Sequence, residues 1–379
     1  MSPGTTIFEH MSGLARAHGA VNLGQGFPDF GWPQDVIDKA AAALTGAASQ
    51  YPPMRGIPEL RQAVADHYRA HQGLELSADE VIVTSGATEA LAAALLALIE
   101  PGDEVLLFQP LYDSYLPMVR RAGGVPKLVR LAPPDWKLTA EAIEAAITPK
   151  TRLMVFNNPH NPAAVAFDRG QLQLLADACV RHDLIAVSDE VWEHVVFDGR
   201  RHVPLMALPG MRERTVKVGS AGKIFSLTGW KVGWLVAAPG LAERVARSHQ
   251  FLTFTTPPNL QTAAAYGLGK DRGYFDDMRA ALQRSRDRLA AGLVEIGYVP
   301  LASQGSYFLS VDLPVSGIDA DDVSFCERIV REAGVAAIPV SAFYAEDPVR
   351  HVVRLCFAKA DATLDAGLEG LARARTLFA

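Results

Sequence analysis

Short apolar or β-branched runs alternate along this chain with longer stretches whose apolar residues recur at helical spacing. Such alternation is typical of α/β proteins, in which helices connect the strands of a mainly parallel sheet. The strands predicted in the first part of the chain are Val81–Thr84, Glu104–Phe108, Leu153–Phe156, Leu184–Val187, Thr215–Val218 and Gly233–Ala237, the last one antiparallel. The helices predicted there are Thr6–His18, Gln34–Leu44, Pro58–His71 and Ala90–Ile99.

The pattern changes after Pro257, where longer and more charged helices appear. The elements predicted in this part are the helices Tyr274–Ile296 and Asp321–Ala333 and the strands Ser306–Val311, Val335–Pro339 and His351–Phe357. We therefore expect a small α/β domain over residues 274–379 and a large domain over residues 46–273. The N-terminal segment, residues 1–45, is expected to pack on the small domain.

The predicted strands of the large domain end, one after another, in polar, aromatic or glycine residues. Because ligands of open α/β sheets bind outside the carboxyl ends of the strands, these ends predict one shared site. Gly86-Ala87-Thr88 separates a strand from a helix, where free amides and the helix dipole favour an anion. An ordinary capping turn is the alternative. The other ends carry Tyr112, Asn157–Pro162, Asp189 and Gly219–Lys223.

The stretch Gly219–Trp234 holds two lysines, Lys223 and Lys231, among glycines and the hydroxyls of Ser220, Ser226 and Thr228. Hydroxyls, a closely approaching backbone and a cation suit a phosphate. A second lysine among apolar neighbours and close to another cation can lose its proton near neutral pH and form a Schiff base. This combination indicates pyridoxal phosphate. A glycine-rich turn with two solvated lysines is the alternative.

Four further residues have side chains that suit such a site. Asp189 ends a buried strand and could pair with a protonated ring nitrogen, or it could cap a helix or form a local salt bridge. Asn161 could donate to a phenolic oxygen or simply belong to an Asn-Pro turn. Tyr112 could stack on an aromatic ring or lie in the core. Arg354 could bind a substrate carboxylate or form an ion pair within the chain.

Composition and charge narrow the class of protein. The chain has 379 residues and a net charge of -6, and no cluster of Lys and Arg suggests nucleic-acid binding. The longest apolar run, Ala90 to Ile99, is too short for a membrane span, and Met1 to Gly4 does not open a signal peptide. Cys179, Cys326 and Cys356 are widely spaced, which favours reduced cysteines in the cytoplasm and no metal site.

The whole chain resembles the class I aminotransferases of the fold-type I pyridoxal-phosphate enzymes. The matching motifs, in the order typical of the family, are Gly86-Ala87-Thr88, Asn157-x-Pro159-x-Asn161-Pro162, Asp189-Glu190-Val191, the lysine signature Gly219–Trp234, and Arg354. Further segments are similar to the methionine and kynurenine (glutamine) aminotransferase branch: Gly24–Phe30, Tyr51–Gly56, Gly305-Ser306-Tyr307-Phe308 and Arg354–Lys359. The resemblance implies a large domain with a mostly parallel seven-stranded sheet flanked by helices, and a smaller α/β domain.

The resemblance also implies an activity. An amino group would move from an L-amino acid of the methionine, glutamine or aromatic type to a 2-oxo acid, by a ping-pong mechanism with aldimine and ketimine intermediates. Phe30, Tyr112, Phe254, Phe308 and Phe343 would line an apolar or aromatic substrate pocket. A C–S β-lyase and a succinyl-diaminopimelate-type aminotransferase are the alternatives with the same cofactor.

The resemblance assigns roles to single residues. Lys223 would form the internal aldimine and then move the proton, and Asp189 would pair with the pyridine nitrogen. Asn161 would bind the phenolic oxygen of the cofactor, and Tyr112 would stack on its ring. The phosphate would be held by Gly86, Ala87, Ser220 and Lys231, with Thr88 as a further cofactor-binding residue and Tyr51 reaching in from the second subunit of a homodimer. Arg354, Asn157, Asn161 and the backbone of Gly26 would bind the substrate.

Trp192 departs from the family pattern, which usually has a tyrosine three residues after the aspartate that corresponds to Asp189. That phenol helps the residue matching Asn161 to hold the cofactor oxygen. An indole N–H can donate a hydrogen bond but cannot ionise, and the ring is bulkier. We therefore count Trp192 among the cofactor-binding residues and expect it to alter the chemistry of the cofactor.

Two alternative functions, a Ser-nucleophile hydrolase and a nucleotide-binding protein, have less support in the sequence. Ser220-Ala221-Gly222-Lys223 is formally an S-x-x-K motif of a Ser-nucleophile acyl hydrolase, but the S-D-N and K-T-G elements of that class are missing from the sequence. Gly222-Lys223 lacks the upstream glycine spacing and the following Ser or Thr of a P-loop.

Overall fold

The computed structural model describes residues 6–46 and 50–378. The N-terminal residues Met1 to Gly4, on which the signal-peptide prediction rests, lie outside that part. The helices are α1 (Ile7–His18), α2 (Gln34–Gly46), α3 (Pro58–Gln72), α4 (Gly86–Leu98), α5 (Tyr115–Arg121), α6 (Ala140–Ala146), α7 (Arg169–Arg181), α8 (Ala221–Ile224), α9 (Pro239–Leu252), α10 (Pro258–Leu268), α11 (Arg272–Glu295), α12 (Asp322–Ala333) and α13 (Asp361–Leu377). The strands are β1 (Val21–Asn22), β2 (Val81–Thr84), β3 (Glu104–Gln109), β4 (Val125–Arg130), β5 (Thr151–Asn157), β6 (Ile185–Asp189), β7 (Thr215–Ser220), β8 (Gly233–Val236), β9 (Phe308–Asp312), β10 (Val335–Ala336), β11 (Ile338–Pro339) and β12 (Val352–Cys356).

The predicted fold class is confirmed. A seven-stranded sheet has the order β2-β8-β7-β6-β5-β3-β4. The pairs from β7 to β4 are parallel, whereas β8 runs antiparallel to both of its neighbours, as the sequence predicted. Two smaller sheets, β1-β10 and β11-β12-β9, are built around the C-terminal part of the chain.

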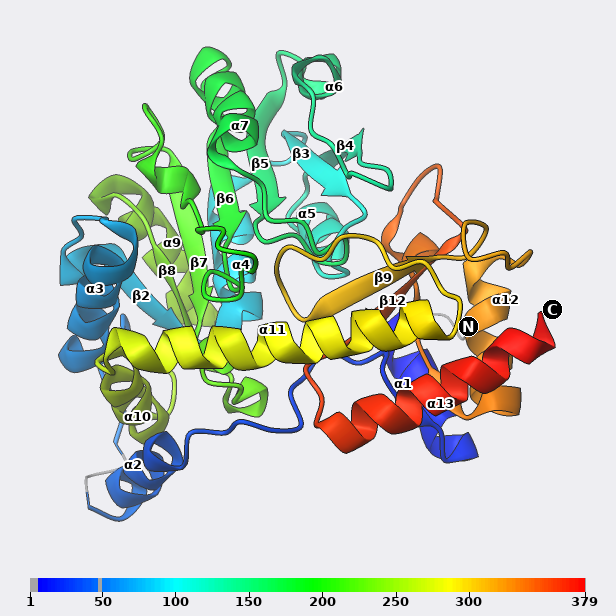
Figure 1. Cartoon of the computed structure of the whole chain (residues 1–379). Coiled ribbons are helices and arrows are strands. Elements are labelled where there is room, and N and C mark those ends of the chain that lie inside the picture. The colour runs from blue at the N-terminus through cyan, green and yellow to red at the C-terminus, as the bar shows by residue number, and fades with distance from the viewer. Residues whose placement is uncertain (1–5, 47–49, 379) are drawn as a thin grey trace.

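Alternate residues of the central strands face opposite layers of helices. Val187 and Val218 belong to the apolar cluster that includes α4 and α9, whereas Phe156 and Ala186 face the cluster that includes α7. Figure 1 shows α4 and α9 behind the sheet and α7 on the near side. Because every central strand is covered on both faces, these strands are apolar over most of their length.

The long helix α11 crosses in front of the molecule, from the side of α3 and α10 to the side of β9 and α13 (Figure 1). Phe275, near its start, packs in the cluster around α3, and Leu289 and Leu293, near its end, pack in the cluster with β9 and α12.

The N-terminal segment contacts both parts of the chain. Strand β1 pairs with β10, and α2 packs against α10. The proposed limits of the domains at residues 45/46 and 273/274 stay a prediction.

Several boundaries differ from those predicted. Helix α4 begins at Gly86 and not at Ala90, because the small residues after β2 are already helical. The segment Val335–Pro339, predicted as one strand, is divided between β10 and β11, which belong to different sheets. None of the helices within residues 6–46 and 50–378 combines the length and the apolar character that crossing a bilayer requires.

Candidate functional site

The carboxyl ends of the strands in the large sheet surround a cavity of about 250 Å³. Its walls come from the ends of β5, β6 and β7 and from the start of α4, as the sequence pattern predicted. The residues that line it are Gly86, Ala87, Thr88, Leu91, Tyr112, Asn157, Asn161, Asp189, Val191, Trp192, Ser220, Gly222, Lys223, Thr228, Lys231 and Val232.

One end of the cavity has the form of an anion site. No side chain caps the first turn of α4 at Ser85, so the amides that follow it remain free for a ligand. A Cβ atom on Gly86 would lie 3.2 Å from Nζ of Lys231, which places this ammonium next to the start of the helix. A Cβ atom on Gly233 would lie 2.7 Å from the backbone nitrogen of Ala87, so glycine allows β8 to approach the same turn.

Lys223 lies in the short helix α8, directly after β7, and points its amino group toward aromatic rings. Its Nζ lies 4.6 Å from the centre of the Trp192 ring, and the phenol of Tyr307 donates a 2.8 Å hydrogen bond to its backbone oxygen. Removal of water from around the amino group lowers the pKa of Lys223 to about 8. The amine is therefore partly unprotonated near neutral pH, which a nucleophilic amine requires.

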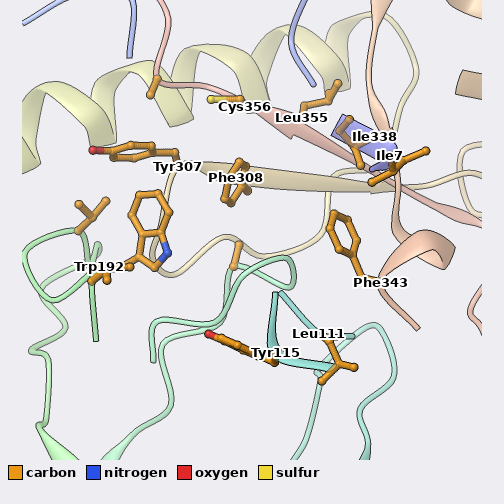
Figure 2. Packing of buried hydrophobic residues seen from close by; sticks show 14 of the residues in the cluster. Ile7, Leu111, Tyr115, Trp192, Tyr307, Phe308, Ile338, Phe343, Leu355 and Cys356 are labelled. Atoms are coloured by element: carbon orange, nitrogen blue, oxygen red, sulfur yellow. The ribbon is translucent and has the colours of Figure 1, made fainter. Parts of the chain in front are cut away.

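Trp192 is almost completely buried, and its ring meets that of Tyr307 edge-on at 4.3 Å between centroids and that of Phe308 at 5.8 Å. Figure 2 shows Trp192 pointing toward these two residues, which come from the C-terminal part of the chain. The indole thus lies between Lys223 and the small sheets.

Asp189, the last residue of β6, is buried, and its carboxylate has two polar partners among residues 6–46 and 50–378. The phenol of Tyr115 donates to its Oδ2 at 2.6 Å, and the backbone N–H of Val191 donates to its Oδ1 at 3.3 Å. Burial raises the pKa of Asp189, although the Tyr115 hydrogen bond opposes this shift. A buried carboxylate without a cationic partner is unfavourable, so this group suits a positively charged ligand atom.

Asn157 is the last residue of β5, and Asn161 lies in the segment that leads from β5 to α7. The side-chain amide of Asn157 donates to the backbone oxygen of Asp189 at 2.9 Å, and its Oδ1 accepts from the backbone N–H of Asn161 at 2.7 Å. Oδ1 of Asn161 accepts from Arg354 at 2.8 Å. With that oxygen engaged, the amide N–H₂ of Asn161 remains as the group that can serve a ligand.

Arg354 is completely buried in β12, and no carboxylate of the described residues lies within salt-bridge distance of it. Its guanidinium donates to Asn161 and to the backbone oxygen of Gly24 at 3.1 Å, while Nε has no partner in the described part of the chain. The ring of Phe308 lies 3.8 Å from its Cζ, and burial lowers the pKa of Arg354 to about 9. A buried guanidinium in such surroundings favours an anionic ligand.

Most of the predicted site residues come together, and three do not line the cavity. Arg354 lies one hydrogen bond away, behind Asn161. Gly26 lies against Phe308, since a Cβ atom on it would be 2.5 Å from Cζ of that ring. Tyr51 is 87% exposed and lies beside Phe254, away from the cavity of its own chain.

The structure places the rings predicted to line an aromatic substrate pocket in different surroundings, and that pocket stays a prediction. Of the five aromatic residues expected there, only Tyr112 lines this cavity. Phe308 and Phe343 instead lie against the guanidinium of Arg354, at 3.8 and 5.1 Å, and Phe254 is partly exposed beside Tyr51. These rings shield the arginine from water.

The sequence analysis missed Tyr115, Leu91, Val191 and Val232. Tyr115 could have been found, because it follows the end of β3 by only a few residues and is the second tyrosine there. The three apolar residues carry no such signal, since alternation within an element does not show which of its residues faces a cavity.

The donor set fits pyridoxal phosphate. Free helix amides beside Lys231 suit the phosphate, the buried carboxylate of Asp189 suits a protonated ring nitrogen, and the amine of Lys223 suits the carbonyl group. Gly86 has a positive φ of 73°, so a side chain there would be strained and would also approach Lys231.

Comparisons with known proteins cover nearly the whole chain. The family model for aminotransferase class I and II matches residues 19–371. A probable N-succinyldiaminopimelate aminotransferase of Mycobacterium tuberculosis is 43% identical over 97% of this chain and 95% of its own length. The methionine aminotransferase of Escherichia coli is 41% identical, over 97% and 95% respectively, and human kynurenine–oxoglutarate transaminase 1 is 36% identical, over 93% and 92%. The solved structure of the N-succinyldiaminopimelate aminotransferase from Mycobacterium tuberculosis superposes with a TM-score of 0.95 at 44% identity, covering 97% of both chains.

Proposed function

Because this chain belongs to the class I and II aminotransferases, whose enzymes use pyridoxal phosphate, we propose that Lys223 is its reactive amine and that its amino donor has an uncharged side chain. The chain is accordingly a pyridoxal-phosphate-dependent aminotransferase, as the sequence predicted. The observation that carries the assignment of Lys223 is its place in one cavity with Asp189 and the anion site of α4, where burial also lowers the pKa of its amine.

When bound, pyridoxal phosphate supplies a carbonyl group and a ring that accepts electrons from the substrate. In this proposal, the residues of the chain bind and orient the cofactor. Lys231, Ser220 and the amides of Gly86 and Ala87 hold the phosphate, with Thr88 beside them. Tyr112 stacks against the ring, the carboxylate of Asp189 keeps the ring nitrogen protonated, and the amide of Asn161 binds the phenolic oxygen.

Lys223 also serves as the base. Once its amine is free, its Nζ would take the proton from the α-carbon of the substrate and hold it until it is returned later in the reaction. Trp192 covers this amine on one side and limits the access of water. The substrate is held by its α-carboxylate, for which the fork of Arg354 and the amides around Asn157, Asn161 and Gly26 are the binding groups.

The class of amino donor follows from the charges near the cavity. Among its described lining residues the cations are Lys223 and Lys231, and Arg354 lies behind Asn161. With these three engaged by the cofactor and the α-carboxylate, the lining offers no further cation for a distal carboxylate. This supports methionine, glutamine and aromatic amino acids over a succinylated donor, in keeping with the methionine and kynurenine aminotransferases among the relatives.

The experiment is an amino-donor panel. Purified protein should have a visible absorbance band. Borohydride should abolish this band and attach the cofactor covalently to Lys223, whereas no cofactor should become covalently attached in the Lys223→Ala variant. Turnover of methionine, glutamine and phenylalanine should require a 2-oxo acid, and N-succinyl-diaminopimelate should react more slowly than these. Faster turnover of the succinylated donor would assign the second candidate, and release of ammonia and pyruvate without a 2-oxo acid would assign a C–S β-lyase.

We also propose that the active unit is a cytoplasmic homodimer. Tyr51 and Phe251 are 87% and 85% exposed and lie with Leu252 and Phe254 on segments next to each other, so a second copy of the chain would cover an apolar face. In that dimer Tyr51 would reach the phosphate in the cavity of the other copy. The three cysteines are buried and unpaired, which fits a reducing compartment.

A further inference from the structure

A buried ion cluster lies on the face of the large sheet opposite the cavity. The side chain of Lys217, in the middle of β7, is completely buried, and its Nζ lies 2.8 Å from Oε2 of Glu190 and 2.6 Å from Oε2 of Glu193. Lys217 and Ser220 are three residues apart on the same strand, so their side chains point to opposite faces. The proposed reaction therefore leaves this lysine without a role.

The two carboxylates stand at the two ends of one tight turn. The backbone N–H of Glu193 donates to the oxygen of Glu190 at 3.0 Å, and the N–H of Glu190 donates to Val218 of β7 at 3.0 Å. Trp192 lies within this turn, and its ring is 4.6 Å from Nζ of Lys223. Any movement of the turn relative to β7 therefore moves the indole relative to the reactive amine.

We propose that Lys217 is a positioning residue, whose ammonium holds both ends of the Glu190–Glu193 turn against β7 and thereby sets the place of Trp192 beside Lys223. This inference rests on the proposed function of Lys223. The cation is needed because two carboxylates with ligand oxygens within 4.8 Å of each other repel at this depth. Glu190, Glu193 and His202 have the spacing of a metal site, but the ammonium already lies on the two carboxylates.

The surrounding groups make the cluster rigid. Glu190 also accepts from Ser188 at 2.9 Å and pairs with His202 at 2.6 Å. Glu193 accepts from Tyr68 at 3.2 Å and from Gln72 at 2.6 Å, both on α3. Burial alone would lower the pKa of Lys217, but the two carboxylates raise it above its usual value, which favours the charged ammonium at neutral pH. With α3 on one side and β7 on the other, the turn has a defined position.

The test is the holoenzyme with Lys217→Met, which keeps an unbranched side chain of nearly the same length and removes the charge. Misplacing a group beside the reacting atoms by about 1 Å can cost roughly a hundredfold in rate, so we expect a fall of about tenfold or more in kcat. KM for the amino donor should stay within about twofold, because Arg354 is not involved. The pH midpoint of the visible absorbance band should shift by about half a unit or more, since the surroundings of Lys223 change.

A variant in which Lys217→Met reduced only the stability of the protein would give a different result. If Lys217→Met lowers Tm or the fraction of protein that binds cofactor, but leaves the band, its pH midpoint and kcat per bound cofactor unchanged, Lys217 is only structural and the inference is wrong. Glu193→Gln keeps the pair of Lys217 with Glu190 and frees one end of the turn. It should shift the band in the same direction by a smaller amount, and it serves as the test if Lys217→Met does not fold.

The matched control is Arg212→Met. Arg212 pairs with the buried Glu80 at the amino edge of the sheet, far from the strand ends that form the cavity. This change should lower Tm without moving the absorbance band. The inference and the proposed function fail separately. An unmoved band in Lys217→Met removes the inference, whereas covalent fixation of the cofactor by borohydride in Lys223→Ala removes the assignment of Lys223.

Discussion

The phenol of Tyr115 donates a 2.6 Å hydrogen bond to Oδ2 of Asp189, and both residues are buried. The two side chains come from elements that are separated by 74 positions in the sequence, and they meet because β3 and β6 end at the same edge of the sheet. The bond favours the ionised carboxylate, whereas burial favours the neutral form and raises the pKa of Asp189. The hydrogen bond from Tyr115 thus opposes the effect of burial and favours the negative charge of Asp189, which would pair with a protonated ring nitrogen.

Tyr115→Phe should weaken catalysis through Asp189. A hydrogen bond to a charged group contributes about 1.5–3 kcal/mol, so kcat/KM should fall by about ten- to a hundredfold. Because the pKa of Asp189 rises further without the phenol, the acid limb of the pH–rate profile should move to higher pH. Tyr298→Phe removes a buried phenol that donates to the backbone of Leu371, remote from the cavity, and should change neither quantity.

The apoenzyme should be destabilised by Lys223 in a pH-dependent way. The pKa of this amine falls from 10.5 in the unfolded chain to about 8 in the folded one, so the folded chain binds the proton less tightly. The cost is therefore present in full below about pH 8 and disappears as the pH rises toward 10.5. Lys223→Met apoenzyme should melt at a higher temperature than the wild type at pH 7, and the difference should shrink above pH 8. A constant difference up to pH 10.5 would contradict the lowered pKa.

Arg354→Lys should affect the binding of the amino donor and not of the cofactor. A lysine keeps the positive charge but loses the two-pronged fork that matches a carboxylate, so KM for the amino donor should rise by about ten- to a hundredfold. The dissociation constant of pyridoxal phosphate, measured by absorbance titration, is the internal control and should stay unchanged. Weaker cofactor binding with an unchanged KM would place Arg354 in a different role.

Gly233→Ala should weaken the binding of the cofactor. The new Cβ atom would lie 2.7 Å from the backbone nitrogen of Ala87 and from the backbone carbon of Gly86, so α4 and Lys231 must move apart. We expect the affinity for pyridoxal phosphate to fall by about tenfold or more, as for the loss of one charge-assisted hydrogen bond. Gly229→Ala is the matched control, because nothing lies within 4 Å of the added atom there. Equal effects of the two changes would exclude the anion site at Gly86.

Mixing two impaired variants tests the role of Tyr51. Lys223→Ala lacks the reactive amine, and Tyr51→Phe lacks the phenol that should reach the neighbouring cavity. In a hybrid dimer one cavity combines Lys223 of one copy with Tyr51 of the other, so it should be intact. Unfolding and refolding the two together should therefore recover up to about a quarter of the wild-type activity, given random pairing in a dimer. Activity no greater than that of Tyr51→Phe alone would place Tyr51 within its own chain.

Much of the site could be predicted from the sequence, because its residues follow strand ends that the pattern of apolar residues identifies. The strand Val81–Thr84 was predicted at its observed limits, and the ends of β5, β6 and β7 were each predicted within three residues. Strand β4 and the helices α5, α6, α7, α8, α9, α10 and α13 were not predicted. Helix α5 has seven residues and includes Pro117, and the side chains of β4 are mostly half-buried or exposed, so neither carries a clear period.

The sequence by itself determined which residue types stand at the carboxyl edge of the sheet, including both lysines of Gly219–Trp234, and so the class of cofactor. Only the tertiary structure decided which groups surround them. Lys217, two residues before Gly219, looks like an ordinary polar residue in a strand, yet it is completely buried between two glutamates from the next turn. Arg354 meets partners that lie 193 and 330 positions away. Contacts at such separations depend on how the layers of helices pack on the sheet, and the local alternation of apolar and polar residues does not determine that packing.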